Sequence, residues 1–283
     1  MSKQALKKLV DIDIGMSEIK EYEERDGEFI RILRYYPEGS LQFQTAKQKI
    51  DILNTVLFGR TLFVNGVLQS SVADEHLYHM NLVSGVHECL NTKSRICILG
   101  GGEGATARAV LARLGERTDA HVTMIDWDTE LVTHFREKEP RWTTVFLGGN
   151  VFDDSRLTVE HSDIFKILEE PRVYDCIYVD LVDPDMNDPM WTSLFEKLLG
   201  WMPAGGVITI NAGGCYPWDM SGVDAIKILY SNLDIPDWFI SHSKVFVPSF
   251  GREWAFVRIT VPPKGTQYGM TYFDVIPLDR QGC

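Results

Sequence analysis

The chain has 283 residues, of which 45% are hydrophobic and 24% charged, as in an ordinary soluble globular protein. Forty acidic side chains outnumber 28 lysines and arginines, and the net charge of −12 speaks against nucleic acid or an anionic membrane as a partner. No stretch reaches the roughly 18 apolar residues of a membrane span. The five cysteines form no CxxC pair, so we expect reduced thiols in a cytoplasmic protein, without a zinc site or a disulfide framework.

The N-terminal quarter of the chain is predicted to be rich in β-strands. Apolar and polar side chains alternate in FIRILRYY, LQFQTAKQKIDILN and TLFVNGVLQ, and turns are expected at PEGS, FGR and NG. A helix is predicted to follow from Asp74 to about Leu90, with Asp74 and Glu75 in an acidic first turn. We therefore expect a β-strand domain of residues 1–71 and a second domain of residues 72–283.

From Arg95 onward, apolar strands alternate with helices. The strand segments are RICILG, HVTMIDWD, RLTVEHSD, DCIYVDLVD and GGVITINAGG, and this alternation predicts a mostly parallel, doubly wound α/β sheet. WFISHSKVFVPSF and EWAFVRITV are expected to form an antiparallel pair at one edge. The tail after Pro263 shows no pattern that predicts its structure.

A glycine-rich turn directly follows the first of these strands. Gly100, Gly101 and Gly102 let the backbone turn tightly and approach a ligand, and the segment ATARAVLARL then has the composition of a helix. Strand, glycine turn and helix together are typical of a nucleotide- or nucleoside-binding unit. Glu103 places an anion inside this turn, where a phosphate would be repelled. The turn therefore predicts a ligand that carries no phosphate and is cationic.

Each of the next strands ends in an acid, and ligands gather beyond the carboxyl ends of strands in such sheets. These acids are Asp126, Asp163 and Asp180. One of them alone would be a helix cap or a solvated turn, but several in register favour a ligand with a ribose in a carboxylate-rich site. S-adenosylmethionine fits, since it is a nucleoside with a sulfonium. Glu103 would repel its carboxylate, so a decarboxylated donor that ends in an ammonium fits better.

At this point the sequence resembles a known family, the polyamine aminopropyltransferases, which comprise spermidine, spermine and thermospermine synthases. The matching motifs are FGRTLFVNGVLQSSVADEHLYH, LGGGEGATAR, MIDWD, YDCIYVDLVDP and VPSF, between Gln48 and Phe256. The resemblance implies a small N-terminal β domain before a Rossmann-like, methyltransferase-type domain, and a homodimer. It also implies two substrates, a polyamine and decarboxylated S-adenosylmethionine.

The resemblance also assigns residues to the two substrates. On the donor side, the glycine turn would hold the nucleoside, Gln48 and Glu103 would face the aminopropyl end, Asp126 would bind the ribose and Asp163 the adenine amino group. On the acceptor side, Tyr78 and Asp180 would flank the attacking nitrogen, Asp183 would bind another amine, and Gln69, His79 and Phe250 would line the cavity.

The implied chemistry is coherent in physical terms. An amine attacks only as the free base, and a carboxylate beside it can accept its proton as a general base, a role that suits Asp180 with Tyr78 as hydrogen-bond partner. The leaving group is a neutral thioether released from a cation, so we expect neither a metal ion nor a separate cofactor.

Several residues depart from the common spermidine-synthase pattern. Glu103 stands where Asp is common, His79 where Gln is common, and Phe250 replaces a tyrosine that contacts putrescine. These residues look more like thermospermine synthases and favour a longer amine such as spermidine. Pro184 is followed by DMNDPMW instead of the usual Gly-Pro of a substrate gate, so a diamine acceptor stays open. The charge of His79 also stays open, between a cation that repels a polyamine and a neutral hydrogen-bond acceptor.

Two other functions remain as alternatives. A methyltransferase that uses intact S-adenosylmethionine would need a positive or amide-rich pocket for the donor carboxylate, and the loop holds no basic residue before Arg108. A non-catalytic protein that binds polyamines or nucleosides could use the same fold. The presence of Asp180, Tyr78 and Gln48 favours an enzyme.

Overall fold

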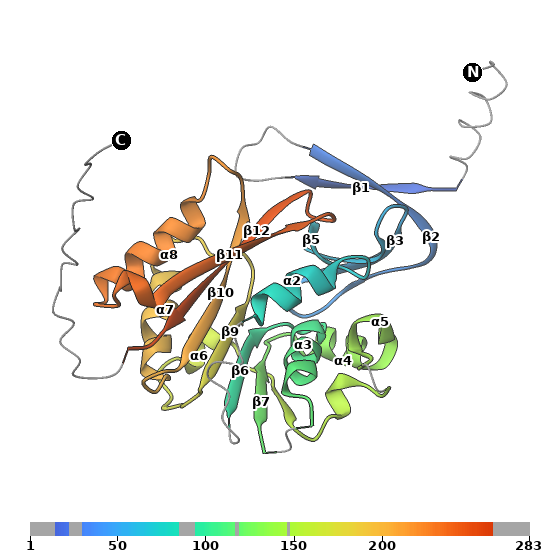
Figure 1. The fold of residues 1–283 in the computed structure, drawn as a ribbon. Coiled ribbons are helices and arrows are strands. Elements are labelled where there is room, and N and C mark those ends of the chain that lie inside the picture. Colours follow the sequence, from blue (N-terminus) through green and yellow to red (C-terminus); the bar gives the residue numbers. More distant parts are fainter. Residues whose placement is uncertain (1–14, 23–29, 85–93, 117–118, 146–147, 263–283) are drawn as a thin grey trace, which may run out of the picture.

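The computed structural model describes residues 15–22, 30–84, 94–116, 119–145 and 148–262 (Figure 1). Within these ranges the strands form two sheets, one of five strands near the N-terminus and one of seven strands after it. The tail after Pro263 lies outside the described residues. So does the part of the predicted helix beyond residue 84, because residues 85–93 are not described.

The first sheet is an antiparallel meander in which each strand pairs with the next along the chain. Its strands are β1 (Ser17–Tyr22), β2 (Ile30–Gln44), β3 (Lys49–Thr55), β4 (Gly59–Val64) and β5 (Val67–Ser71). Asn65 and Gly66 join β4 to β5 with φ angles of 52° and 83°, so the predicted NG hairpin turn is confirmed. The sheet ends at Ser71, and the division into two domains after this residue stays a prediction.

The turn predicted at PEGS is wrong. Residues 37–40 lie inside β2, where the pairing with β3 shifts register between Tyr36 and Leu41. Gly39, with a φ of 71°, allows the backbone to bulge there without reversing its direction. Ser40 fixes the bulge from both sides, because its hydroxyl donates to the Tyr36 carbonyl at 2.6 Å and accepts from the Asn54 amide at 2.9 Å. Polar turn-forming residues here make a bulge within one long strand.

The helix that follows is shorter than predicted within the described residues. Helix α2 (Glu75–Leu82) starts where expected and ends with the amide of Ser84 bonded to the Asn81 carbonyl at 3.1 Å, which is a tighter turn than an α-helix makes. The Ser84 hydroxyl donates to the same carbonyl at 2.7 Å. Side-chain bonds of this kind compete with helical ones and favour an end to the helix.

The second sheet has the order β11-β12-β10-β9-β6-β7-β8. Its parallel strands are β6 (Arg95–Gly100), β7 (His121–Ile125), β8 (Leu157–Glu160), β9 (Cys176–Asp180) and β10 (Val207–Cys215). The last two strands, β11 (Ile240–Val247) and β12 (Arg252–Thr260), add an antiparallel pair beside β10. Both the mostly parallel sheet and its antiparallel edge are therefore confirmed, and the glycine turn leaves the sheet from its central region.

Helices cover both faces of this sheet (Figure 1). Along β6, Ile96 and Ile98 point into one core and Cys97 and Leu99 into the other, as the two-residue period of a strand requires. The first core lies under α2, α3 (Ala105–Leu114), α4 (Thr129–Lys138) and α5 (Pro140–Thr143). The second lies under α6 (Ile164–Ile167), α7 (Pro189–Gly200) and α8 (Ser221–Asn232). Two short 3₁₀ segments (Val151–Asp153 and Asp237–Phe239) complete the described helices.

The N-terminal sheet is bonded to the larger unit through side chains. Trp142 of α5 donates its indole proton to Ser70 of β5 at 2.9 Å, and Arg60 of β4 forms an ion pair with Glu139 just before α5. Thr45, between β2 and β3, donates to Asp128 at 2.7 Å. These contacts bring β4, β5 and the loop between β2 and β3 to the end of the large sheet where the glycine turn lies. Across the described ranges no helix has the length and apolar character needed to span a bilayer.

Candidate active site

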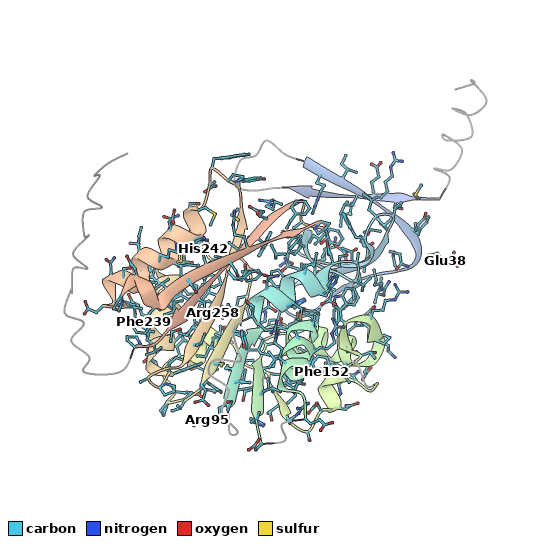
Figure 2. All side chains as sticks on the ribbon, viewed as in Figure 1. Glu38, Arg95, Phe152, Phe239, His242 and Arg258 are labelled. Carbon is cyan, nitrogen blue, oxygen red and sulfur yellow. The ribbon has the colours of Figure 1, made fainter. Side chains whose placement is uncertain are left out.

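The glycine turn brings the backbone unusually close to two of the predicted acids. A Cβ atom on Gly100, whose φ is 85°, would lie 2.2 Å from the carbonyl oxygen of Asp180. A Cβ on Gly102 would lie 2.7 Å from Oδ2 of Asp126. Only glycine fits these two approaches, and the ends of β9 and β7 therefore meet at the turn that follows β6. Phe152, labelled in Figure 2, packs against the end of the turn, 3.0 Å from where a Cβ on Gly104 would be.

Asp180 accepts hydrogen bonds on both of its carboxylate oxygens. Tyr78 of α2 donates to Oδ1 at 2.9 Å, and Thr106 of α3 donates to Oδ2. Burial and the charge of Glu103 raise the pKa of Asp180, while the charge of His79 and the two hydroxyl bonds act in the opposite direction. Burial and the charge of Asp180 raise the pKa of Tyr78 well above its usual value, so the phenol stays protonated and donates.

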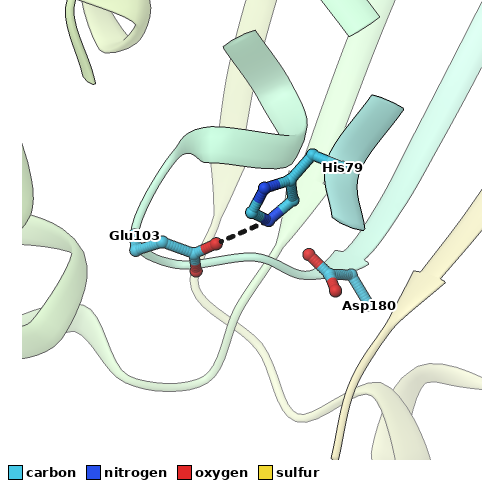
Figure 3. Close-up of side chains that lie close together, drawn as sticks. All are labelled: His79, Glu103 and Asp180. Atoms are coloured by element: carbon cyan, nitrogen blue, oxygen red, sulfur yellow. Dashed lines mark ion pairs between the residues drawn. The ribbon is translucent and has the colours of Figure 1, made fainter. Parts of the chain in front are cut away.

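His79 lies between two carboxylates. Its Nδ1 is 2.9 Å from Oε2 of Glu75, one turn earlier in α2, and its Nε2 is 3.3 Å from Oε1 of Glu103 (Figure 3). Arg108 of α3 pairs with the other oxygen of Glu75. The four side chains therefore form a chain of alternating charge that is buried in its middle, at Glu75 and His79, and partly exposed at its ends, Arg108 and Glu103.

The two carboxylates decide the charge of His79. Burial alone lowers the pKa of an imidazole, but the hydrogen bonds to Glu103 and Glu75 outweigh it and raise the pKa of His79 to about 10. The imidazole is therefore a cation at neutral pH, which resolves the question that the sequence left open. Glu103 is consequently not a lone anion in the glycine turn, because it already faces a buried positive charge.

A small cation could be surrounded by the acids of this region. Ligand atoms of His79, Glu103 and Asp180 lie within 4.8 Å of one another (Figure 3). An imidazolium has no free lone pair, so at neutral pH His79 offers nothing to a metal ion. The two carboxylates can still accept protons from an ammonium group. The absence of a metal from the reaction stays a prediction.

Asp126 lies at the end of β7, beside the glycine turn. Its Oδ1 accepts from the amide of Asp128 at 2.8 Å, and only 9% of its surface is exposed. Burial raises the pKa of Asp126 to about 6, although the amide of Asp128 partly opposes the rise. Asp128 itself caps α4 through the amide of Leu131 at 3.0 Å. The two acids of the motif IDWD therefore differ in role. Asp128 caps a helix, whereas Oδ2 of Asp126 faces the glycine turn at Gly102.

Gln48 belongs to the loop between β2 and β3, which is fixed against the start of α4. The hydroxyl of Thr45 accepts from the amide of Gln48 at 3.0 Å and donates to Asp128 at 2.7 Å. The amide of Ala46 donates to Glu130. The backbone of Gln48 is thus fixed near the start of α4, on the side where Asp126 lies, and the role of its side chain toward the donor stays a prediction.

Tyr78, which donates to Asp180, is part of an aromatic wall that we define as Tyr78, Phe250 and Trp254. The ring centroids of Phe250 and Trp254 are 4.4 Å apart, and those of Tyr78 and Phe250 are 6.1 Å apart. Trp254 donates to Oδ1 of Asn211 at 2.7 Å, and the amide nitrogen of Asn211 donates to Asp183 at 3.3 Å. The predicted acceptor residues Phe250 and Asp183 therefore belong to one connected group.

Two predicted residues make their contacts within their own elements. Asp163 caps α6 through the amide of Phe165 at 3.1 Å and pairs with Lys166 at 3.5 Å. Gln69 is the extra residue of a bulge in β5, and its side chain donates to the carbonyl of Val67 at 3.4 Å. These contacts give neither residue a part in the Asp180 cluster, so their assignment to the substrates stays a prediction.

Thr106, Asn211 and Trp254 were not predicted from the sequence, and neither was the part that Glu75 and Arg108 have in the site. The spacing of Glu75 and His79, four residues apart on a helix, was a usable signal for one ion pair. Thr106 carried no such signal, because its bond to Asp180 joins α3 to β9 across 74 residues of sequence.

Comparisons with known proteins agree with this geometry. The model of the spermine/spermidine synthase domain matches residues 72–233. A polyamine aminopropyltransferase of Sulfolobus acidocaldarius is 32% identical over 216 residues, which cover 74% of this chain and 67% of the relative. Polyamine aminopropyltransferase 1 of Hyperthermus butylicus is 37% identical over 260 residues, which cover 87% of this chain and 82% of the relative.

The fold is shared with solved structures as well. Spermidine synthase from Thermotoga maritima superposes with a TM-score of 0.69 over 86% of this chain and 79% of that one, at 16% identity. This likeness supports the Rossmann-like α/β fold preceded by an antiparallel sheet. The family match spans the glycine turn, Asp126, Asp180 and the helices α2 and α3 that contact Asp180. The chain therefore belongs to the spermine/spermidine synthase family.

Proposed function

We propose that this protein transfers the aminopropyl group of decarboxylated S-adenosylmethionine to an amine acceptor and releases 5′-methylthioadenosine. The observation that carries the proposal is Asp180, a partly buried carboxylate that accepts from a protonated Tyr78 at 2.9 Å and lies beside the glycine turn, which holds a second carboxylate, Glu103. Family membership and the names of the relatives support the same reaction.

In the proposed reaction, the free-base nitrogen of the acceptor attacks the aminopropyl carbon that is bonded to sulfur. The new C–N bond takes its electron pair from nitrogen, and the C–S pair returns to sulfur, which leaves as a neutral thioether. Asp180 takes the proton that the nitrogen loses, and Tyr78 orients the carboxylate. The positive sulfonium supplies the driving force, so the proposal needs neither a metal ion nor a separate cofactor.

The donor would lie along the glycine turn. Asp126 would accept hydrogen bonds from the ribose, Asp163 from the adenine amino group, and Gln48 and Glu103 would face the aminopropyl ammonium. Asp126 suits this task because its remaining oxygen faces Gly102. His79 would stay behind Glu103 and balance the charge of the acids, rather than contact the acceptor as a free base.

The acceptor would lie against the aromatic wall. Methylene groups pack well on aromatic rings, ammonium groups are attracted to their faces, and Asp183 could pair with a second amino group of the same chain. Phe250 and Gln69 would line this cavity. These features support an acceptor with at least two amino groups, and the thermospermine-like residues favour one as long as spermidine. We further propose a homodimer, as the resemblance implies, and a cytoplasmic location, which the five cysteines without a CxxC pair favour.

A methyltransferase remains the second candidate because of one observation. The His79 imidazolium of α2 lies 3.3 Å from Glu103, so a positive charge lies beside the glycine turn and could face the carboxylate of intact S-adenosylmethionine. Such an enzyme would transfer the methyl group and release S-adenosylhomocysteine. The two reactions therefore differ in their nucleoside product.

The test supplies purified protein with decarboxylated S-adenosylmethionine and, separately, putrescine, cadaverine, agmatine, spermidine and norspermidine. Chromatography should detect 5′-methylthioadenosine with at least one amine. Asp180→Asn removes the base and should reduce turnover by about 100-fold or more while donor affinity is retained. Full turnover in this variant would show that Asp180 is not the base. If no amine of the panel gave 5′-methylthioadenosine and the protein bound intact S-adenosylmethionine, the methyltransferase would be favoured.

A further inference from the structure

Thr106 is a buried polar residue that the proposed reaction has not used. It lies in the first turn of α3, none of its surface is exposed, and its hydroxyl donates to Oδ2 of Asp180. Threonine within a helix commonly bonds to a carbonyl one turn earlier in the same helix. Here the hydroxyl reaches across to the end of β9 instead. This bond links the helix that follows the glycine turn directly to the carboxylate at the centre of the site.

The glycine turn makes room for this contact. A Cβ on Gly101 would lie 3.3 Å from Oδ2 of Asp180 and 3.5 Å from Cβ of Thr106. The carboxylate and the threonine thus lie together over the bare backbone of Gly101. A Cβ at that position would press against the carboxylate and contact the threonine.

We propose that Thr106 is a positioning residue for the aminopropyl transfer: its hydroxyl holds Oδ2 of Asp180, so that the carboxylate presents a fixed and ionised edge to the attacking amine. The inference rests on the proposed function, because it assumes that Asp180 is the base.

The geometry explains why one hydroxyl would not suffice. A carboxylate offers about four lone-pair positions on its two oxygens. The terminal torsion of Asp is broad, so a carboxylate held at one oxygen alone can rotate. Tyr78 holds Oδ1 and Thr106 holds Oδ2, which fixes the plane of the group and leaves one lone pair on each oxygen for substrate.

The surrounding charges explain why the second bond matters for ionisation. Tyr78 and His79 face Asp180 from α2, and Glu103 faces it from the glycine turn, while the charge of Asp183 acts on the neighbouring phenol. Burial and Glu103 raise the pKa of Asp180, and the hydroxyl of Thr106 lowers it, since it bonds to the charged form. Without Thr106 the carboxylate would be protonated over a wider range of pH.

The experiment compares Thr106→Val, which keeps the shape of the side chain without its hydroxyl, with Thr106→Ser, which keeps the hydroxyl. Thr106→Ala removes the hydroxyl in a smaller side chain and must agree with the valine variant. Thr209→Val is the matched control, because Thr209 is a buried threonine of β10 whose hydroxyl has no hydrogen-bond partner among the described residues. The rate of 5′-methylthioadenosine release is measured from pH 6 to pH 9 at saturating substrates.

We expect the acidic limb of the kcat profile to move upward by about 1 to 2 pH units in Thr106→Val and Thr106→Ala. The loss of rate should therefore reach about 10-fold or more at the acidic end and shrink toward pH 9. Thr106→Ser and Thr209→Val should keep the wild-type profile. Donor affinity, measured by calorimetry, should stay close to that of the wild type in all four variants.

An unchanged profile in Thr106→Val, or a loss that is equal at every pH and is not rescued by serine, would overturn the inference. A second measurement does not depend on turnover. The carboxyl carbon of Asp180, assigned in NMR spectra with Asp180→Asn, should titrate at a higher pH in Thr106→Val than in the wild type. If the wild type were inactive with every amine, the proposed function would fail, and this titration alone would decide the role of Thr106.

Discussion

Replacing His79 by glutamine removes the positive charge that lies between Glu75 and Glu103 and keeps a polar side chain of comparable reach. His79 is 4% exposed, and its two nitrogens lie 2.9 and 3.3 Å from carboxylate oxygens. The pKa of His79 rises from 6.5 to about 10 on folding, which corresponds to about 5 kcal/mol at about 1.4 kcal/mol per pH unit. Removing one partner from a buried ion pair typically costs about 3–5 kcal/mol. Both routes give the same order, so we expect His79→Gln to lose about 3–5 kcal/mol of unfolding free energy at pH 6.

The loss should depend on pH in a defined direction. A group whose pKa is raised by folding stabilises the folded state fully below its unfolded pKa, and this stabilisation disappears as the pH rises through its folded pKa. For His79 this window runs from 6.5 to about 10. Urea unfolding of both proteins should therefore show a difference that is largest near pH 6 and becomes small near pH 10. His121→Gln is the control, since His121 is exposed on β7. A difference that is constant across this range, or absent at pH 6, would refute the ion-pair chain.

Two other predictions concern the donor side. Burial raises the pKa of Asp126 to about 6, and only the carboxylate can accept from both ribose hydroxyls, so donor affinity by calorimetry should fall between pH 7 and pH 5. Asp126→Asn should bind donor about 10-fold or more weakly at pH 7.5 and lose this pH dependence, whereas a wild-type affinity that is flat with pH contradicts the assignment. Gly100→Ala would bring a Cβ to 2.2 Å from the Asp180 carbonyl, and we expect it to unfold or to lose all turnover. Gly66 has a φ of 83° and no atom within 4 Å of an added Cβ, so Gly66→Ala should lose only about 1–2 kcal/mol of unfolding free energy in urea. Equal losses in both variants would argue against the close approach at Gly100.

Local patterns were enough to predict most of the larger sheet. The strands that follow Arg95 are short apolar runs with glycine or acid at their ends, and each forms where its pattern indicates. The approach of Asp126 and Asp180 to the glycine turn also follows from the sequence, because parallel strands end at one edge of a sheet. Here the chemistry depends on topology, and topology follows from the alternation of strands and helices.

Contacts between elements were harder to predict. Glu75 and His79 are neighbours on one helix, but their links to Arg108 and Glu103 depend on how α2 packs against α3. Because of this packing, Glu103 is not a lone anion in the glycine turn but forms an ion pair with His79. Glu103 alone is therefore weaker evidence against a donor carboxylate than the sequence indicated. The turn predicted at PEGS was wrong for a different reason. Its residues are typical of turns, and only the pairing with β3 on both sides keeps them within one strand.

In the proposed reaction the carbon chain of the donor, and not its methyl group, moves to the acceptor. The most direct test uses decarboxylated S-adenosylmethionine with one isotopic label in the aminopropyl carbons and another in the methyl group. Mass spectrometry of the products should find the aminopropyl label in the lengthened amine and the methyl label in 5′-methylthioadenosine. A methyl label in the amine, or an acceptor without either label after donor consumption, would contradict the aminopropyl transfer.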